Sequence, residues 1–151
     1  MGQDGIDLET SLGYLLKEAS SALRTAMEDV LRPLGMNVTR YSCLELLAQR
    51  PGLSNSELAR GAFVTRQSMN VLLQTLEREG HVPRAAEPTV GKVLPARLTP
   101  LGRRSLARAT AAVRSVELRM LAGLSEDQQA EAFRLLRQMT RSLRDGDRPP
   151  G

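Results

Sequence analysis

Apolar side chains recur at gaps of three and four residues between residues 8 and 31, interrupted only by adjacent apolar pairs. This spacing places them on one stripe of a helix with about 3.6 residues per turn. The members of the stripe are Leu8, Leu12, Leu15, Leu16, Ala19, Leu23, Ala26, Met27, Val30 and Leu31. Pro33 and Gly35 follow directly, so the pattern predicts one long amphipathic helix that ends there.

The next two helices are predicted from residues that can cap a helix. Thr39 is the expected N-cap of the second helix, which Pro51-Gly52 ends. Ser54 and Glu57 have the spacing of a capping box, in which each side chain accepts a hydrogen bond from the other residue's backbone N–H. They predict a short third helix that continues through Ala59.

A fourth helix is expected to start after Thr65, run to Glu79 and stop at Gly80. Its apolar residues have the spacing i, i+3, i+4 and i+7 and should face inward. They are Met69, Leu72, Leu73 and Leu76. A short helix, a tight turn and a second helix are the parts of a helix-turn-helix.

Two short extended runs follow, at residues 82–86 and 93–98, around a turn at residues 87–92. They predict a two-stranded hairpin. Pro83 and Pro95 are acceptable in it because both strands of an isolated hairpin are edge strands.

The last part of the chain predicts two more helices. Thr99-Pro100 supplies a capping hydroxyl and a proline at the first helical position, and Gly123 ends that fifth helix. Ser125 and Gln128 have capping-box spacing and open a sixth helix. The fold class is therefore mainly α (α+β), and residues 146–151 are expected to form a flexible tail.

Positive charge is confined to the middle of the chain. Residues 1–59 hold 5 basic and 8 acidic residues, residues 60–114 hold 10 basic and 3 acidic residues, and residues 115–151 hold 6 of each. A basic region between neutral or acidic flanks suggests a polyanion-binding surface. The chain has one cysteine and no run of apolar residues long enough to span a bilayer. Its first nine residues are polar and acidic, so no secretion signal is expected there. These features predict a cytoplasmic protein without a disulfide, a metal site or a cofactor.

The predicted inward stripe of the fourth helix leaves a polar face outward, and its residues are Arg66, Gln67, Asn70, Gln74 and Arg78. Arginine can pair with guanine, and glutamine or asparagine with adenine, in the major groove of DNA. Ser68 and the Thr65 hydroxyl are placed to donate to phosphates near the helix N-terminus. The alternative is an ordinary amphipathic helix with a solvated face. The basic middle region and the following hairpin favour DNA binding.

Three segments in order resemble the MarR family of winged helix-turn-helix regulators. They are Gly52-Leu53-Ser54-Asn55-Ser56-Glu57-Leu58-Ala59, Leu76-Glu77-Arg78-Glu79-Gly80-His81-Val82-Pro83-Arg84 and Leu98-Thr99-Pro100-Leu101-Gly102. The resemblance covers about residues 8–143. It implies a homodimer whose first, fifth and sixth helices pack together, with the fourth helices in successive major grooves and the hairpins, as wings, in the minor groove. Many members release DNA when a small aromatic or phenolic ligand binds, or when a cysteine is oxidised.

The resemblance divides the chain into a dimerisation helix (1–35), a DNA-binding region (36–99), C-terminal dimerisation helices (100–145) and the tail (146–151). It adds Arg84 and Lys92 of the wing to the predicted DNA contacts. The family's wing usually reads Asp-Pro-x-Asp-Arg-Arg, whereas this chain has Val90 and Gly91 at the second Asp and the first Arg. The expected partners are double-stranded DNA, as a pseudo-palindromic operator, a second copy of the chain, and a small aromatic effector.

Four further residues could have a functional role, and each also has a structural explanation. Tyr14 and Tyr41 are candidates to line an effector pocket, although tyrosines at such positions are more often half-buried core residues. Cys43 is expected to be a buried thiol rather than a redox switch, and His81 a packing residue or a phosphate contact. A single His and a single Cys leave little for an enzyme active site. A helical dimer that acts as a protein adaptor would explain the amphipathic outer helices but not the helix-turn-helix.

Overall fold

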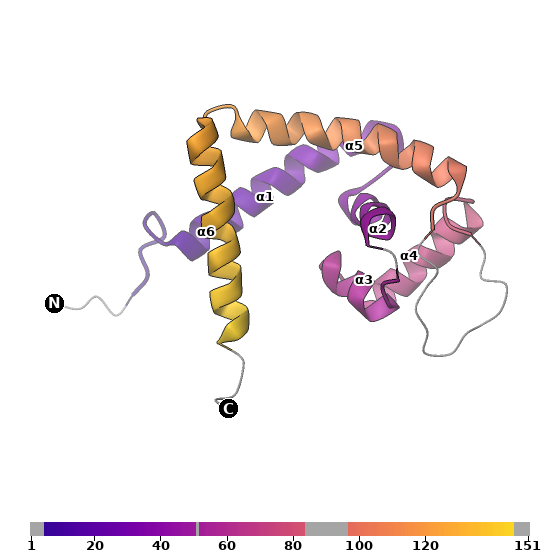
Figure 1. Ribbon diagram of the computed structural model, residues 1–151, viewed down its shortest axis with the longest axis horizontal. Helices are drawn as coiled ribbons and strands as arrows, with labels where there is room; N and C mark the ends of the chain where they lie inside the picture. Colours follow the sequence, from indigo (N-terminus) through magenta and orange to yellow (C-terminus); the bar gives the residue numbers. More distant parts are fainter. Residues whose placement is uncertain (1–4, 51, 84–96, 147–151) are drawn as a thin grey trace. The chain divides into compact units, whose positions relative to one another are not determined.

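The computed structural model describes residues 5–50, 52–83 and 97–146 (Figure 1). The chain divides into two compact units, Met1–Val116 and Glu117–Gly151.

The first helix, α1, spans Leu12–Leu31 and begins where a side chain can cap it: Ser11 Oγ accepts a hydrogen bond from the backbone N–H of Tyr14 at 3.3 Å. A short 3₁₀ helix, η1, covers Arg32–Leu34. Gly35 follows in the left-handed region at φ 69°, a conformation that favours glycine. The predicted long helix is therefore confirmed, although it starts after Leu8.

Helix α2 spans Val38–Gln49, and the prediction that Thr39 caps it is wrong. The N-cap is Asn37, whose Oδ1 accepts a hydrogen bond from the backbone N–H of Arg40 at 2.8 Å. Asparagine in an extended conformation caps at least as well as threonine, so the earlier residue starts the helix. The backbone N–H of Val38 donates to Glu28 Oε1 at 2.9 Å and thereby ties α2 to α1.

The next two helices start where their caps predict. Helix α3 spans Asn55–Gly61 and has the full capping box, and hydrogen bonds from Ser54 lower the pKa of the Glu57 carboxyl. Helix α4 spans Arg66–Arg78 with Thr65 as its N-cap, and Gly80 follows at φ 79°.

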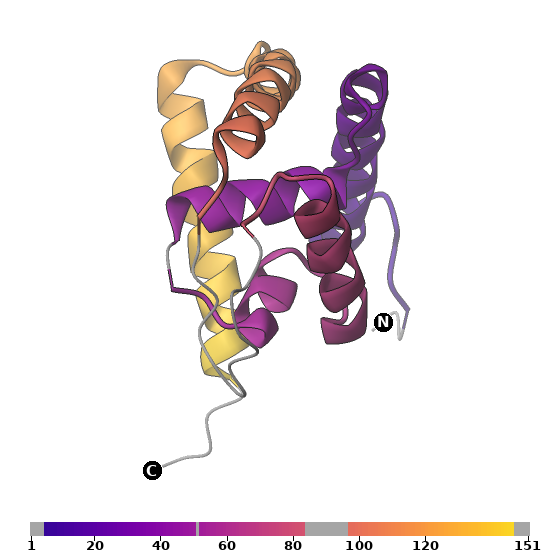
Figure 2. The same cartoon turned by 90° about the vertical axis from the view of Figure 1, so that its right-hand side faces the viewer.

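Helix α2 lies between the other helices of the first unit. It is seen end-on in Figure 1 and lengthwise in Figure 2, and in both views α3 and α4 lie on one side of it and α5 on the other.

Helix α5 spans Pro100–Leu121 and crosses from the first unit into the second. As predicted, the Thr99 hydroxyl caps it by accepting from the backbone N–H of Gly102 at 3.0 Å. Helix α6 spans Glu126–Asp145 behind the predicted capping box of Ser125 and Gln128. No residue of α6 is buried.

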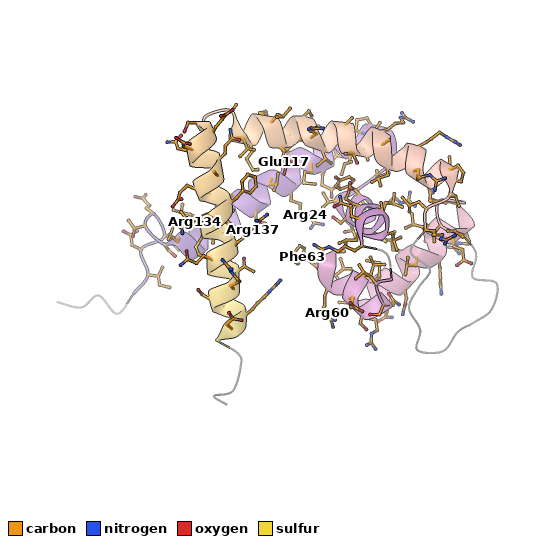
Figure 3. The ribbon with its side chains drawn as sticks, viewed as in Figure 1. Arg24, Arg60, Phe63, Glu117, Arg134 and Arg137 are labelled. Carbon is orange, nitrogen blue, oxygen red and sulfur yellow. The ribbon has the colours of Figure 1, made fainter. Side chains whose placement is uncertain are left out.

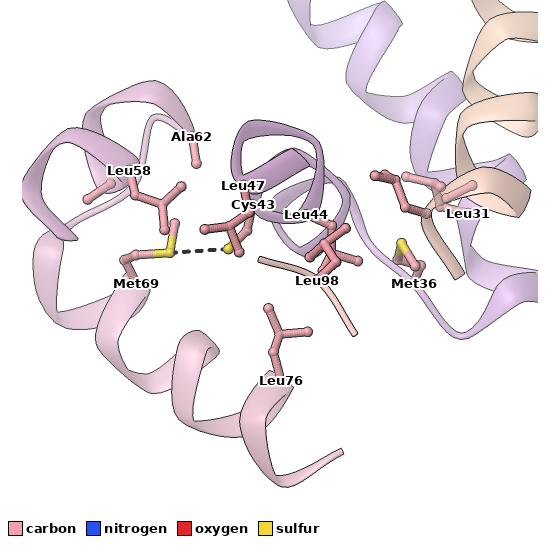
Figure 4. Packing of buried hydrophobic residues seen from close by; sticks show 13 residues of the cluster. Leu31, Met36, Cys43, Leu44, Leu47, Leu58, Ala62, Met69, Leu76 and Leu98 are labelled. Atoms are coloured by element: carbon pink, nitrogen blue, oxygen red, sulfur yellow. Dashed lines mark hydrogen bonds between the residues drawn. The ribbon is translucent and has the colours of Figure 1, made fainter. Parts of the chain in front are cut away.

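The hydrophobic core of the first unit is aliphatic and centres on α2 (Figure 4). Side chains from α1 to α5 contribute to it. Its buried members are Leu31, Met36, Cys43, Leu44, Leu47, Leu58, Ala59, Ala62, Met69, Leu76, Leu98, Leu106 and Ala109. This core holds α3 and α4 against α2 and so fixes which face of α4 points outward.

The described residues form helices and connecting segments, without a strand. The mainly helical class is confirmed, while most of the predicted hairpin and the tail lie outside the described residues. Among the helices described, none is long and apolar enough to cross a membrane.

Candidate nucleic-acid interface

Burial fixes the rotation of α4. Met69 and Leu76 are fully buried, and Leu72 and Leu73 are half-buried against the core, which confirms the predicted inward stripe. The polar residues expected on the opposite face are all exposed: Arg66, Gln67, Asn70, Gln74 and Arg78. A helix with this face free can enter a major groove without disturbing the core.

The N-terminus of α4 is organised by two hydroxyl groups. Thr65 Oγ1 accepts from the backbone N–H of Ser68 at 3.1 Å and donates to Ser68 Oγ at 2.9 Å. Since the Thr65 hydrogen is used inside the cap, the Ser68 hydroxyl is the better donor toward a phosphate. The end of a helix that carries free N–H groups also attracts anions.

Arg66 is held across the turn of the helix-turn-helix. Its Nε and Nη2 atoms donate to Ser56 Oγ of α3, at 2.9 and 2.6 Å. Sequence reasoning missed Ser56, because the two residues are separated by a turn whose geometry the spacing alone does not fix. This contact occupies one edge of the guanidinium, so base reading through that edge would require Arg66 to leave Ser56.

One outward residue of α4 is apolar and was also missed. The Val71 side chain is 58% exposed, between the exposed Asn70 and Gln74. The sequence did carry a signal, since Val71 lies four residues after Gln67 and therefore on the same face.

Acidic groups do not offset the polar face of α4. Glu77 is its only carboxylate, and it is not fully exposed. Glu79, which caps the C-terminal end, accepts a hydrogen bond from the guanidinium of Arg40 in α2. The outward face thus presents amide, hydroxyl and cationic groups, which suit the base edges and phosphates of DNA.

The end of α4 is docked on the start of α5. The backbone N–H of Thr99 donates to the His81 carbonyl at 3.1 Å, and the Thr99 hydroxyl donates to the Gly80 carbonyl. His81 is half-buried, with Nε2 3.1 Å from Ser105 Oγ. Of the two predictions for His81, the structure supports the packing residue.

Comparison with known proteins identifies the family. The HTH-type transcriptional repressor Rv2887 of Mycobacterium tuberculosis is 44% identical over 135 residues, which are 89% of this chain and 97% of the relative. Residues 34–92 match the MarR family. The chain belongs to the MarR family.

Two crystal structures of that relative are similar to this MarR-family chain over most of its length. The complex with p-aminosalicylic acid has a TM-score of 0.72 at 44% identity and covers 87% of this chain and 99% of the other. The complex with DNA has a TM-score of 0.69 at 42% identity and covers 86% and 98%. The relative therefore has a DNA-bound form and a form with a small aromatic acid.

The single cysteine of this MarR-family chain is a core residue. Cys43 is fully buried, and its Sγ lies 3.6 Å from the Met69 sulfur (Figure 4). Burial raises the pKa of the thiol to about 12. The expectation of a buried thiol is confirmed, and because the thiolate is the reactive form of cysteine, its lack of reactivity stays a prediction.

We expect Cys43 to resist thiol reagents and hydroperoxide in the folded protein at neutral pH, because the thiol is both inaccessible and protonated. The rate at which Cys43 reacts with a disulfide reagent that releases a coloured product, compared with and without denaturant, measures this. Rapid modification of native protein, or DNA release by hydroperoxide that Cys43→Ser abolishes, would contradict it.

The two tyrosines predicted to bind a ligand lie on different helices of the first unit. Tyr14 of α1 is exposed, and Tyr41 of α2 is half-buried against the core. The exposed face of α6 in the second unit, where Figure 3 labels Arg134 and Arg137, forms an open surface depression that neither tyrosine lines. The structure thus leaves the ligand role of both tyrosines a prediction.

Arg84 and Lys92, the predicted wing contacts, lie outside the described residues. Their contribution to DNA binding stays a prediction.

The segment that follows α3 has an unusual backbone conformation: Phe63 (Figure 3) has φ 58° and is 89% exposed. Non-glycine residues rarely adopt this region, so sequence reasoning gave no reason to expect it at a phenylalanine.

Proposed function

We propose that this chain is a transcriptional repressor that binds a pseudo-palindromic operator through the outward face of α4. One observation carries the proposal: a relative 44% identical over 135 residues is named a transcriptional repressor and has a crystal structure with DNA. The exposed amide and guanidinium groups of α4 supply the base-reading chemistry. Thr65, Ser68, Arg84 and Lys92 contact or orient the phosphates in this proposal, and Arg66 leaves Ser56 to reach a base edge.

The proposed repressor is a cytoplasmic homodimer. Helix α6 has an apolar face and no buried residue, and Phe133 on that face is 53% exposed. On α1 several large apolar side chains are also exposed: Leu12, Tyr14, Leu15 and Leu16. A second copy of the chain is the expected cover for these faces. The protein acts by binding, and the proposal assigns it no catalytic residue, metal or cofactor.

We expect Gln67→Ala or Asn70→Ala to relax base preference at one symmetric pair of operator positions. Loss of one bidentate contact removes roughly 1–3 kcal/mol of discrimination. Half-sites are expected about 10 bp apart, since two-fold-related helices enter the groove one turn apart. Selection of preferred sites from a random DNA pool, by wild type and each variant, measures the effect.

Gln138→Ala on α6 is the matched control and should select the wild-type operator. If Gln67→Ala and Asn70→Ala also select it unchanged, α4 is not the base-reading helix. If wild type enriches no DNA at all, the adaptor interpretation replaces the repressor.

A small aromatic acid is the proposed effector, because the relative was crystallised with p-aminosalicylic acid. We expect p-aminosalicylic acid to release a fluorescent operator from the protein, as followed by anisotropy. Tyr14→Phe and Tyr41→Phe test the predicted pocket, since each removes one hydroxyl and retains the ring. If the same concentration of p-aminosalicylic acid releases the operator from wild type and from both variants, the tyrosine hydroxyls do not contribute to effector binding.

A further inference from the structure

Val71 lies in the middle of the outward face of α4. Successive residues of a helix are rotated by about 100°, so Val71 shares a stripe with Gln67, four residues before it, and Gln74, three residues after it. The buried side chains of Met69 and Leu76 define the opposite face. Any groove that receives Gln67 also receives Val71.

The folded chain gains little from valine at this position. The side chain is 58% exposed, so most of its apolar surface stays in water. Valine is also a poorer helix former than alanine, because its branched Cβ loses rotamer freedom in a helix. Neither packing nor helix propensity explains the residue, while the stiff branch gives its two methyl groups defined directions.

Only one apolar group is available on the base edges of the major groove, the 5-methyl group of thymine. We propose that Val71 is a specificity-determining residue that selects thymine by packing against its 5-methyl group. This inference rests on the proposed binding of DNA through α4.

The test replaces thymine by deoxyuridine, one symmetric pair at a time, in the operator selected by wild type. Deoxyuridine pairs as thymine does and lacks only the methyl group. For wild type we expect one pair where the replacement weakens binding about fourfold per half-site, the effect of exposing one buried methyl group, and thus about 15-fold for the dimer. Val71→Ala should bind the thymine and deoxyuridine operators equally at that pair.

Two further measurements separate base reading from a structural role. Val71→Ile keeps the branched side chain and should retain the deoxyuridine penalty. Val71→Ala should unfold at the wild-type temperature or above, since alanine is the better helix former. Equal deoxyuridine penalties in wild type and Val71→Ala, or no sensitive pair in wild type, would overturn the proposal. If Gln67→Ala still relaxes the operator in that case, the repressor function stands and only the role of Val71 falls.

Discussion

We expect Gly102→Ala to destabilise the protein more than any other single methyl group added to a described glycine. A Cβ at residue 102 would lie 2.2 Å from the backbone carbonyl oxygen of His81. That distance is far below van der Waals contact, and the atom is backbone, so it cannot move away by a change of rotamer. We expect a loss of about 3 kcal/mol in the free energy of unfolding, at the upper end for overpacking by one carbon.

The clash falls on the junction that holds the end of α4 against α5. The His81 carbonyl also accepts the hydrogen bond from the Thr99 N–H, so any shift that relieves the clash disturbs this bond. Thermal unfolding measures the effect, and for a domain of this size a loss of about 3 kcal/mol corresponds to roughly 6–12 °C.

Gly13→Ala is the matched control. Gly13 is an exposed glycine of α1, and the atom nearest to a Cβ added there would be Ser11 Oγ at 3.8 Å. Alanine is the better helix former, so this variant should unfold at the wild-type temperature or higher. Equal unfolding temperatures for Gly102→Ala and wild type would show that the junction adjusts freely and that the close contact is unimportant.

Local signals predicted the fold well because the helix caps depend on neighbouring residues. Ser54, Thr65 and Ser125 each accept from the backbone N–H three residues later, as their spacing predicts. The same reasoning placed one cap wrongly, at Thr39, because Asn37 two residues earlier is an equally good cap. Capping residues therefore predict that a helix starts nearby. Where two of them lie close together in the sequence, they do not determine which one is the N-cap.

Long-range contacts could not be predicted in the same way. Gly102 lies close to His81, and Arg66 donates a hydrogen bond to Ser56. In each case the distance in space between the two segments depends on how the whole core packs. Val71 was missed for a different reason, since the outward face was described by its polar side chains alone and an aliphatic residue on that face was left out. The outward polar face was predicted because four inward positions fixed the rotation of α4.

The second large effect concerns dimerisation, and it comes from a substitution on the apolar face of α6. Phe133, Leu136 and Leu143 lie within one side of the helix, and Phe133 and Leu143 are 53% and 79% exposed. We expect Phe133→Asp to convert the proposed dimer to monomer or to insoluble protein. An unpaired carboxylate buried at an interface costs at least about 3 kcal/mol, and two-fold symmetry places two of them there. The dissociation constant should then rise by about 10⁴-fold.

Gln138→Asp adds the same charge to the opposite side of α6, where Gln138 accepts a hydrogen bond from Arg134 at 3.1 Å. This variant should remain dimeric, so a change of mass confined to Phe133→Asp assigns the interface to the apolar face. Sedimentation equilibrium at micromolar concentration measures both variants, and a monomeric wild type would refute the dimer directly. Operator binding then follows the assembly: a monomer presents one α4 to one half-site, so Phe133→Asp should lose the preference for paired half-sites while retaining weak binding to a single one.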